Sequence, residues 1–195
     1  MRSYDYSQRS GVDPISWERF EQLVRLLAEQ VESFEPQIIL GIARGGLFPG
    51  TMLSFILRRE FYPIRLTRRY EDAVVRERPT WLVRPPDKVR GRRVLIVDEI
   101  VDSGVTLALA AYEVRGMGAS EVRTAALFAH TWAEPRPDWV ALTSDALILN
   151  PWDREVLIQG KWATHPELAA ALKLVAPKED RPDSDAPTRQ AQKSG

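Results

Sequence analysis

The chain has 195 residues, of which 44% are hydrophobic and 28% are charged. This composition is ordinary for a globular domain and excludes a wholly disordered or fibrous chain. The 27 Lys and Arg residues balance the 27 Asp and Glu residues, so no overall basic field attracts nucleic acid. The absence of cysteine excludes disulfides, thiolate nucleophiles and cysteine-based zinc sites.

No apolar run approaches the ~18 residues of a membrane span, and the first residues lack the apolar core of a signal peptide. We therefore expect a cytoplasmic protein with neither membrane nor nucleic acid as a partner. One domain is expected over residues 13–175. Residues 176–195 are rich in Pro, Ser and charge, and too little apolar surface is present there to offset the entropy of ordering. Residues 1–12 are similar, so flexible tails are expected at both ends.

Apolar periodicity predicts the elements of the first half of the domain. Residues from Trp17 to about Ser33 place apolar side chains on one helical face, and Ser16 stands at the N-cap position. The elements predicted next are a buried strand over 37–42, a loop over 43–46, a helix over 47–59 and a strand over 61–66.

Residues 67–91 are rich in Arg, contain three Pro and show little periodicity. A long stretch of this kind inside a compact domain is often functional. The elements predicted after it are a buried strand over 94–98, a helix over 104–117, strands over 122–128, 139–142 and 146–149, and a helix over 166–175. Strands that alternate with helices predict an α/β fold with a parallel sheet, whose ligands bind beyond the carboxyl ends of the strands.

The most informative segment is Val94–Ala110, with the sequence VLIVDEIVDSGVTLALA. Asp98 and Glu99 follow a buried strand, and Asp102 comes three residues later. Carboxylates at a strand end are costly to desolvate unless they are paired, protonated or close to a cation. The next four residues offer a glycine, two hydroxyls and the free N–H groups of a helix N-terminus, which suit a phosphate. The segment thus combines acceptors for sugar hydroxyls or Mg²⁺ with a phosphate cradle. For any single residue, a solvated turn is the alternative.

A second segment of this kind follows the predicted strand over 37–42. It consists of Ala43, Arg44, Gly45 and Gly46. Two glycines let the backbone curl around an anion, and an Arg adds charge-assisted hydrogen bonds. A tight strand-to-helix turn with a surface Arg is the alternative.

The Val94–Ala110 segment resembles the phosphoribosyl pyrophosphate (PRPP) binding motif of type I phosphoribosyltransferases. The family pattern is four apolar residues, two acids, two apolar residues and Asp-Thr-Gly-x-Thr, from which only Ser103 departs. The resemblance implies a Rossmann-like parallel sheet flanked by helices, with a small hood built from residues of about 13–35 and 140–165. It assigns the following roles: Asp98 and Glu99 to the ribose or Mg²⁺; Ser103, Gly104, Val105 and Thr106 to the 5′-phosphate; Ala43, Arg44, Gly45 and Gly46 to pyrophosphate; and Asp102 to proton exchange at purine N7.

A third segment, Leu147–Asp153, resembles the Pro-Trp-acid region of 6-oxopurine phosphoribosyltransferases of the bacterial xanthine-guanine and hypoxanthine type. The resemblance implies that Leu147 and Ile148 cover the base and that Asp153 helps to hold a second Mg²⁺. Trp152 is more simply a packing residue of the hood. The Arg-rich stretch is expected to close over the site as a lid, with Tyr70 and Arg76 as contacts.

The sequence departs from the family at the positions that contact the base. The Lys that usually donates to the purine 6-oxo group is replaced by His130, which can donate one hydrogen bond. Leu147 replaces an aromatic residue, and Leu149 replaces an acid that reads a 2-amino group. His165 is most simply a residue of a helix cap.

The resemblance as a whole implies a Mg²⁺-dependent enzyme that transfers the phosphoribosyl group from PRPP to a purine, with a 6-oxopurine favoured, in purine salvage. A homo-oligomer, either a dimer or a tetramer, is expected. Two alternatives stay open at this point. One is a PRPP-binding regulator of the same fold that acts on nucleic acid or a partner. The other is a phosphoribosyltransferase for another base, such as adenine or a pyrimidine.

Overall fold

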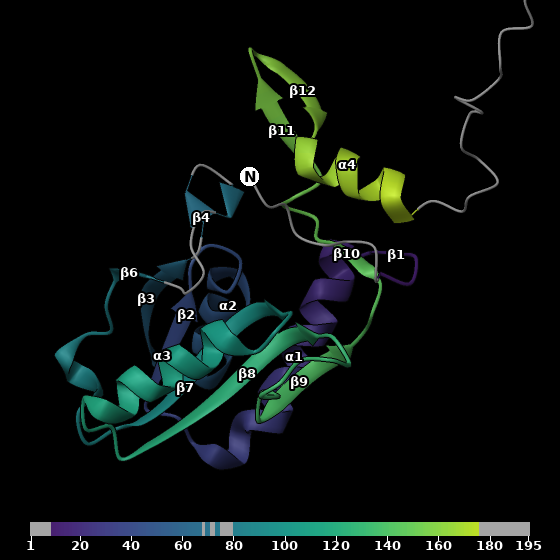
Figure 1. Ribbon diagram of the computed structural model, residues 1–195. Helices are drawn as coiled ribbons and strands as arrows, with labels where there is room; N and C mark the ends of the chain where they lie inside the picture. The colour runs from purple at the N-terminus through teal and green to yellow at the C-terminus, as the bar shows by residue number, and fades with distance from the viewer. Residues whose placement is uncertain (1–8, 68, 71–72, 75–79, 176–195) are drawn as a thin grey trace, which may run out of the picture.

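A six-stranded sheet with helices on both faces forms the centre of the molecule (Figure 1). The computed structural model describes residues 9–67, 69–70, 73–74 and 80–175. In sheet order the strands are β6 (Thr80–Val83), β3 (Glu60–Thr67), β2 (Ile38–Ile42), β7 (Arg93–Val101), β8 (Glu121–Ala129) and β9 (Trp139–Thr143). All neighbours are parallel except β6, which runs antiparallel to β3. The predicted α/β class with a parallel sheet is confirmed.

The central strands form because their apolar runs are buried on both faces. All five residues of β2 are buried, and so are the four apolar residues that follow Arg93 in β7. Val94 and Ile96 join the core on one side of the sheet, whereas Leu95 and Val97 join the core on the other side. This double burial is typical of parallel strands covered by helices.

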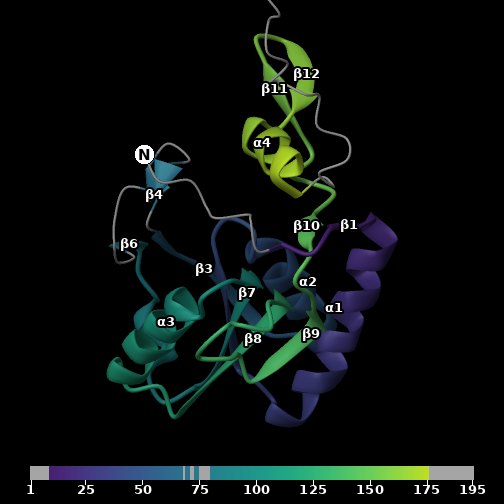
Figure 2. The ribbon, with the colours of Figure 1, turned by 45° about the vertical axis from the view of Figure 1, so that its right-hand side comes forward.

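Three helices supply that cover. Helices α1 (Trp17–Val31) and α2 (Leu47–Leu57) pack on one face, and α3 (Val105–Gly116) packs on the other (Figure 2). The Ser16 side chain caps α1 by accepting a hydrogen bond from the Arg19 amide at 3.1 Å, as its position predicted. A short 3₁₀ helix, Glu32–Phe34, follows α1.

The order of the strands creates a crevice at one edge of the sheet. From β2 the chain continues outward to β3, whereas β7, β8 and β9 continue in the opposite direction. Connections therefore diverge between the carboxyl ends of β2 and β7, and ligands of open α/β sheets bind at such a switch point. The expected pyrophosphate loop follows β2, and the expected 5′-phosphate loop follows β7.

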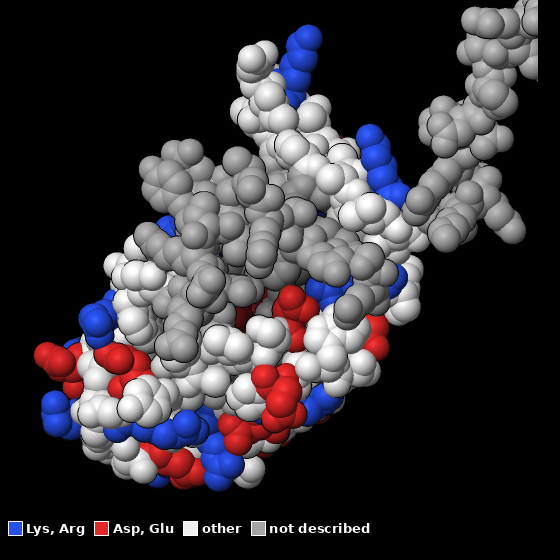
Figure 3. Space-filling model, in the orientation of Figure 1, with Lys and Arg blue, Asp and Glu red and all other residues white. Residues whose placement is uncertain are grey.

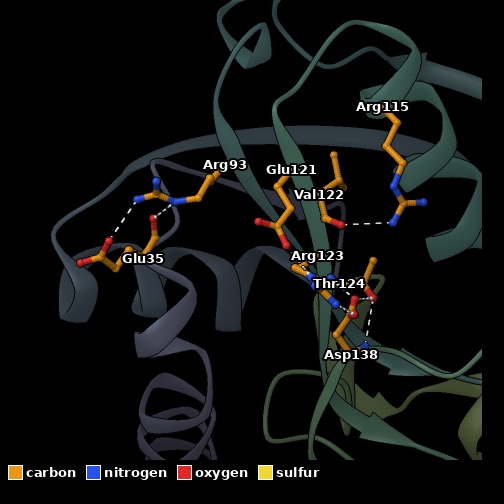
Figure 4. A network of polar contacts seen from close by, with 8 residues as sticks. All are labelled: Glu35, Arg93, Arg115, Glu121, Val122, Arg123, Thr124 and Asp138. Carbon is orange, nitrogen blue, oxygen red and sulfur yellow. Dashed lines mark hydrogen bonds and ion pairs between the residues drawn. The ribbon is translucent and has the colours of Figure 1, made fainter.

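A network of polar contacts fixes the opposite end of the sheet (Figure 4). At the start of β7, Arg93 Nε donates to the Glu35 carbonyl at 3.0 Å. At the start of β9, the Asp138 carboxylate accepts from the Thr124 amide and hydroxyl, both at 2.8 Å, and from Arg123 at 2.9 Å. These contacts set the register of β8 and β9, and with it the height at which each strand ends in the crevice.

A small hood stands above the crevice and is built from the first and the last elements of the described chain (Figures 1 and 2). Its parts are β1 (Val12–Pro14), β10 (Leu147–Leu149), β11 (Glu155–Ile158), β12 (Lys161–Thr164) and α4 (Pro166–Val175). Strands β1 and β10 pair in parallel, and β11 and β12 form an antiparallel hairpin.

The hood differs from the expectation in three ways. Helix α1 covers the sheet instead of belonging to the hood. The β11–β12 hairpin was not predicted. Residues 9–12, expected within a flexible tail, are anchored by backbone hydrogen bonds: the Ser10 amide donates to the Asp145 carbonyl at 2.9 Å, and β1 begins at Val12. The rest of that tail and residues 176–195 lie outside the described residues.

The Arg-rich stretch is partly structured. Strand β6 extends the sheet beside β3, and β4 (Arg69–Tyr70) pairs with β5 (Ala73–Val74). A 3₁₀ helix, Asp87–Val89, leads to β7. The expected lid contact Tyr70 lies in β4 with its side chain outside the described part, and Arg76 is not among the described residues. Within the described ranges, no helix is long and apolar enough to cross a membrane.

Candidate active site

A cavity of about 700 Å³ opens where β2 and β7 end, beneath the hood. It is lined by most of the predicted site residues: Ala43, Arg44, Gly45, Asp98, Glu99, Asp102, Ser103, Gly104, Thr106, His130, Leu147, Ile148 and Asp153. Of the predicted residues whose side chains the structure describes, two do not line it. The Val105 side chain is exposed, and Gly46 packs between strand ends. The structure therefore brings together residues that are more than a hundred positions apart in the sequence.

Asp98 and Glu99 were expected to follow the end of a strand. The structure places them inside strand β7 instead. The strand continues to Val101, which pairs with Ala129 of β8. The Asp98 side chain accepts a hydrogen bond from the Glu99 amide at 2.8 Å. Both carboxyl groups are thus held by a paired strand, which is a more rigid support than a loop.

Glu99 reaches across to the loop that follows β2 and to the hood. Asn150 Nδ2 donates to its Oε1, and a methyl group added at Gly45 would overlap its Oε2. The charges of Arg44 and Asp153 also act on this carboxyl. Glu99 therefore stands between the expected pyrophosphate loop and Asp153.

Burial determines the protonation of both acids. It raises the pKa of Asp98 to about 7. It also raises the pKa of Glu99 to about 8, helped by the negative charges of Asp98 and Asp153 and opposed by the Asn150 amide and Arg44. Removing water disfavours a lone carboxylate, whereas a cation would favour it. Without a cation, both groups hold their protons near pH 6.

This protonation predicts a protein that loses stability as the pH rises. The folded-state pKa values lie above the ordinary values of about 4, so the folded chain binds more protons than the unfolded chain. The contribution of these two protonated groups to the free energy of unfolding is present at acidic pH and is lost as the pH rises through about 7 to 8. Because 1 kcal/mol corresponds to about 2–4 °C in a chain of this size, we expect the unfolding temperature in EDTA to fall by about 5 °C or more between pH 6 and pH 9.

The matched control is the double variant Asp98→Asn, Glu99→Gln, which keeps hydrogen-bonding groups and removes both titrations. Its unfolding temperature should change less over the same range. An equal slope in the two proteins would assign the pH dependence to other groups.

The loop between β7 and α3 has the features of a phosphate cradle. Gly104 precedes the first residue of α3 with φ +77°, a conformation that favours glycine. The first turn of α3 has no acidic residue, and its backbone N–H groups are available to an anion. Ser103 and Thr106 add hydroxyls at the wall of the cavity.

The Ala43–Gly46 loop meets β7 at close range. A methyl group on Gly46 would lie 2.7 Å from the carbonyl oxygens of Ile42 and Val97. Only glycine fits there without separating the ends of β2 and β7. The loop then enters α2, so a second helix N-terminus faces the crevice.

Asp102 is held by two residues that were not predicted in the site. Its Oδ1 accepts a hydrogen bond from Arg9 Nη2 at 3.3 Å and another from Trp132 Nε1 at 3.1 Å. Arg9 belongs to the expected tail, and no role was predicted for Trp132. Both contacts join segments that lie far apart in the sequence. The N-terminal segment is also polar, so nothing in its sequence indicated that the Arg9 side chain would be buried.

The hood provides an apolar wall. Leu147, Ile148 and Leu149 line the cavity. Trp152 packs as predicted, because its ring stacks on Phe48 with centroids 4.1 Å apart, although it also lines the cavity. His165, expected only as a cap residue, lies at the start of α4 and lines the cavity as well.

The donor groups fit Mg²⁺ if substrate oxygens complete its shell. Among the described residues, no group of three or more His, Asp or Glu side chains could hold a metal by itself. Asp98, Glu99 and Asp153 nevertheless line one cavity, and Mg²⁺ usually takes one or two carboxylates together with waters and phosphate oxygens.

Basic and acidic side chains are interleaved over the face seen in Figure 3, so its coloured part shows no continuous basic patch. A nucleic-acid surface would require clustered Lys and Arg. The described residues on that face therefore offer no basic surface of the kind that binds nucleic acid.

Comparisons with known proteins identify the family to which this chain belongs. The family described as "phosphoribosyl transferase domain" matches residues 16–158. The chain is 30% identical to the xanthine-guanine phosphoribosyltransferase of Cereibacter sphaeroides over 71% of this chain and 85% of that protein. It is also 30% identical to the hypoxanthine-guanine phosphoribosyltransferase of Saccharomyces cerevisiae over 56% of this chain, but spans only 58% of that protein's length.

The crystal structure of a purine phosphoribosyltransferase from Pyrococcus horikoshii matches with a TM-score of 0.66 and 29% identity. The match covers 76% of this chain and 98% of that one. The family match includes both loops of the crevice and the strands that carry them. The chain thus belongs to the phosphoribosyltransferase family and is an enzyme of that class.

Proposed function

We propose that this enzyme transfers the 5-phosphoribosyl group from PRPP to a purine base, releases pyrophosphate, depends on Mg²⁺ and serves purine salvage. The observation that carries the proposal is the meeting of two glycine-bearing loops and two carboxyl groups in one cavity. Each loop opens a helix whose N-terminus faces the crevice, which suits a substrate with phosphate groups at both ends of a ribose.

In the reaction, the bond between the anomeric carbon and pyrophosphate breaks, and a bond from that carbon to a purine nitrogen forms. Positive charge develops on the ribose, so the enzyme must neutralise the leaving group, align the reactants and exclude water. In this proposal Arg44 binds the leaving pyrophosphate, and Asp102 takes the proton that the base loses from N7. Bound Mg²⁺ would supply charge neutralisation at pyrophosphate.

A 6-oxopurine is the base that we propose. The names of the relatives in yeast and Cereibacter support this choice, since both enzymes act on such bases. Leu147 and Ile148 supply an apolar cover for a flat ring. We also propose that the enzyme works in the cytoplasm as a homo-oligomer. Phe55 on α2 is 79% exposed, and Ile56 lies beside it, so this helix offers an apolar surface for association.

The test is a panel in which PRPP and Mg²⁺ are incubated with one nucleobase at a time and pyrophosphate release is measured. We expect release with hypoxanthine, xanthine or guanine, and its loss when EDTA removes Mg²⁺. Uracil and adenine serve as controls for the choice of base. Tight PRPP binding without release for any base would contradict the proposal and favour a PRPP-binding regulator.

A further inference from the structure

Two buried nitrogen atoms beside Asp102 have no hydrogen-bond partner: Arg9 Nη1 and His130 Nε2. Both side chains line the cavity and are 7% and 1% exposed, respectively. Buried polar atoms in native proteins are nearly always paired. A ligand in the cavity is therefore the natural partner for both atoms.

One of these atoms is a donor and the other is an acceptor. His130 Nδ1 lies 2.6 Å from the carbonyl oxygen of Ser144, which can only accept, so Nδ1 carries a hydrogen. Burial, helped by the positive charge of Arg9, lowers the pKa of His130, so the ring is neutral and its Nε2 has a free lone pair. The Arg9 guanidinium can only donate.

Both side chains are fixed around Trp132. The His130 ring stacks on it with centroids 4.6 Å apart and an interplanar angle of 14°. The Arg9 guanidinium carbon lies 5.0 Å from the centroid of the same ring. The Trp132 indole donates to Asp102, and so does Arg9 through its other terminal nitrogen, Nη2. The unpaired donor and the unpaired acceptor thus belong to one rigid cluster with Asp102.

We propose that Arg9 and His130 select 6-oxopurines, with Arg9 Nη1 donating to the 6-oxo oxygen and His130 Nε2 accepting from N1–H. The inference rests on the proposed function, in which Asp102 faces N7. The 6-oxo group lies between N7 and N1–H on the perimeter of the purine, so groups beside Asp102 can reach both the 6-oxo oxygen and N1–H. A 6-aminopurine reverses both polarities, because its 6-group donates and its N1 accepts. Arg9 therefore supplies the donor for the 6-position, whereas His130 is an acceptor and not the donor that its position in the sequence suggested.

The test compares three nucleotides that share the ribose 5′-phosphate and differ only at carbon 6: inosine, adenosine and unsubstituted purine ribonucleoside 5′-monophosphates. Their affinities are measured by calorimetry at pH 8, where the His130 ring is neutral. The native protein should prefer the inosine nucleotide to each of the others by about 100-fold. Arg9→Ala should weaken inosine nucleotide binding by about 10- to 100-fold, the range of a hydrogen bond to a charged group. The other two affinities should change by less than about threefold.

His130→Phe keeps a flat ring against Trp132 and removes the acceptor. It should weaken the inosine nucleotide by about tenfold, again with little change for the unsubstituted one. Arg25→Ala, on the exposed side of α1, is the matched control and should change none of the affinities. Arg9→Met, which keeps an extended side chain but has no donor, serves in place of Arg9→Ala if that variant fails to fold, with loss of inosine nucleotide preference again expected.

Four results would overturn the inference. An equal loss of all three affinities in the Arg9 variants would make Arg9 a support of Asp102 only. A gain in all three would make it a side chain that blocks the site. Equal binding of all three nucleotides to the native protein would remove the selection but leave the phosphate cradle intact. Failure of the native protein to bind any of them would overturn the proposed function and the inference with it.

Discussion

Replacing Asp102 with Asn is expected to lower turnover by about 10²-fold or more, the range typical of lost acid–base catalysis. The amide cannot take the proton that the purine loses from N7. PRPP affinity should be kept, because the phosphate loops and Glu99 are unchanged. The measurement is kcat for pyrophosphate release at saturating base and PRPP, together with the Kd of PRPP.

The geometry around Asp102 makes this variant a clean test. An Asn oxygen can still accept from Arg9 Nη2 and Trp132 Nε1, so the cluster should persist. Asp138→Asn is the matched control, since Asp138 also accepts several hydrogen bonds but lies at the opposite end of the sheet. It should affect stability and leave the turnover of the folded enzyme unchanged. Unchanged turnover in Asp102→Asn would remove this carboxylate from the mechanism.

The central part of the fold was predictable because its strands are buried on both faces. Continuous apolar runs such as Val94–Val97 have few other interpretations between turn signals. Both limits of β2 and β8 and the start of β7 were predicted to within one residue. Where β7 ends was less evident. Acidic residues usually mark the end of a buried strand, but here Asp98 and Glu99 continue the ladder with β8 because they face a cavity.

The hood was harder to predict because its strands are short and half exposed. The β11–β12 hairpin turns at Gln159-Gly160, and both residues have positive φ. Gln-Gly is a weaker turn signal than Asn-Gly or Asp-Gly, so the hairpin was missed. The contribution of Val156 to the cavity wall was missed for the same reason.

The part of the site that forms one continuous motif could be predicted from the sequence. The contacts between residues far apart in the sequence could not. Asp98 to Thr106 form one string whose chemistry can be inferred residue by residue. Arg9 and Asp102 are 93 positions apart. The pairing of β1 with β10 and the hydrogen bond from the Ser10 amide to the Asp145 carbonyl bring that N-terminal segment to the site. His130 was predicted to contact the purine base. Only the structure shows that the Ser144 carbonyl fixes the ring hydrogen of His130 on Nδ1.

A valine at Gly104 is expected to abolish measurable PRPP binding and to destabilise the fold by about 2–4 kcal/mol. Two effects combine. A branched side chain is strained at φ +77°, and its Cβ would overlap the Pro135 carbonyl oxygen and lie 2.8 Å from the Glu134 carbonyl carbon. These neighbours are backbone atoms that cannot rotate away, so the loop itself must move and its N–H groups must leave the phosphate position.

Gly91→Val separates strain from crowding. Gly91 also has positive φ, at +70°, but a Cβ there would meet nothing within 4 Å. This control should lose stability through strain alone and bind PRPP as the native protein does. Thermal unfolding and calorimetric titration with PRPP provide the two measurements, and Gly104→Ala replaces the valine variant if that protein does not fold. Native PRPP affinity in a folded Gly104 variant would show that the 5′-phosphate binds elsewhere, because no cradle at the start of α3 could survive the displacement that a Cβ at this position requires.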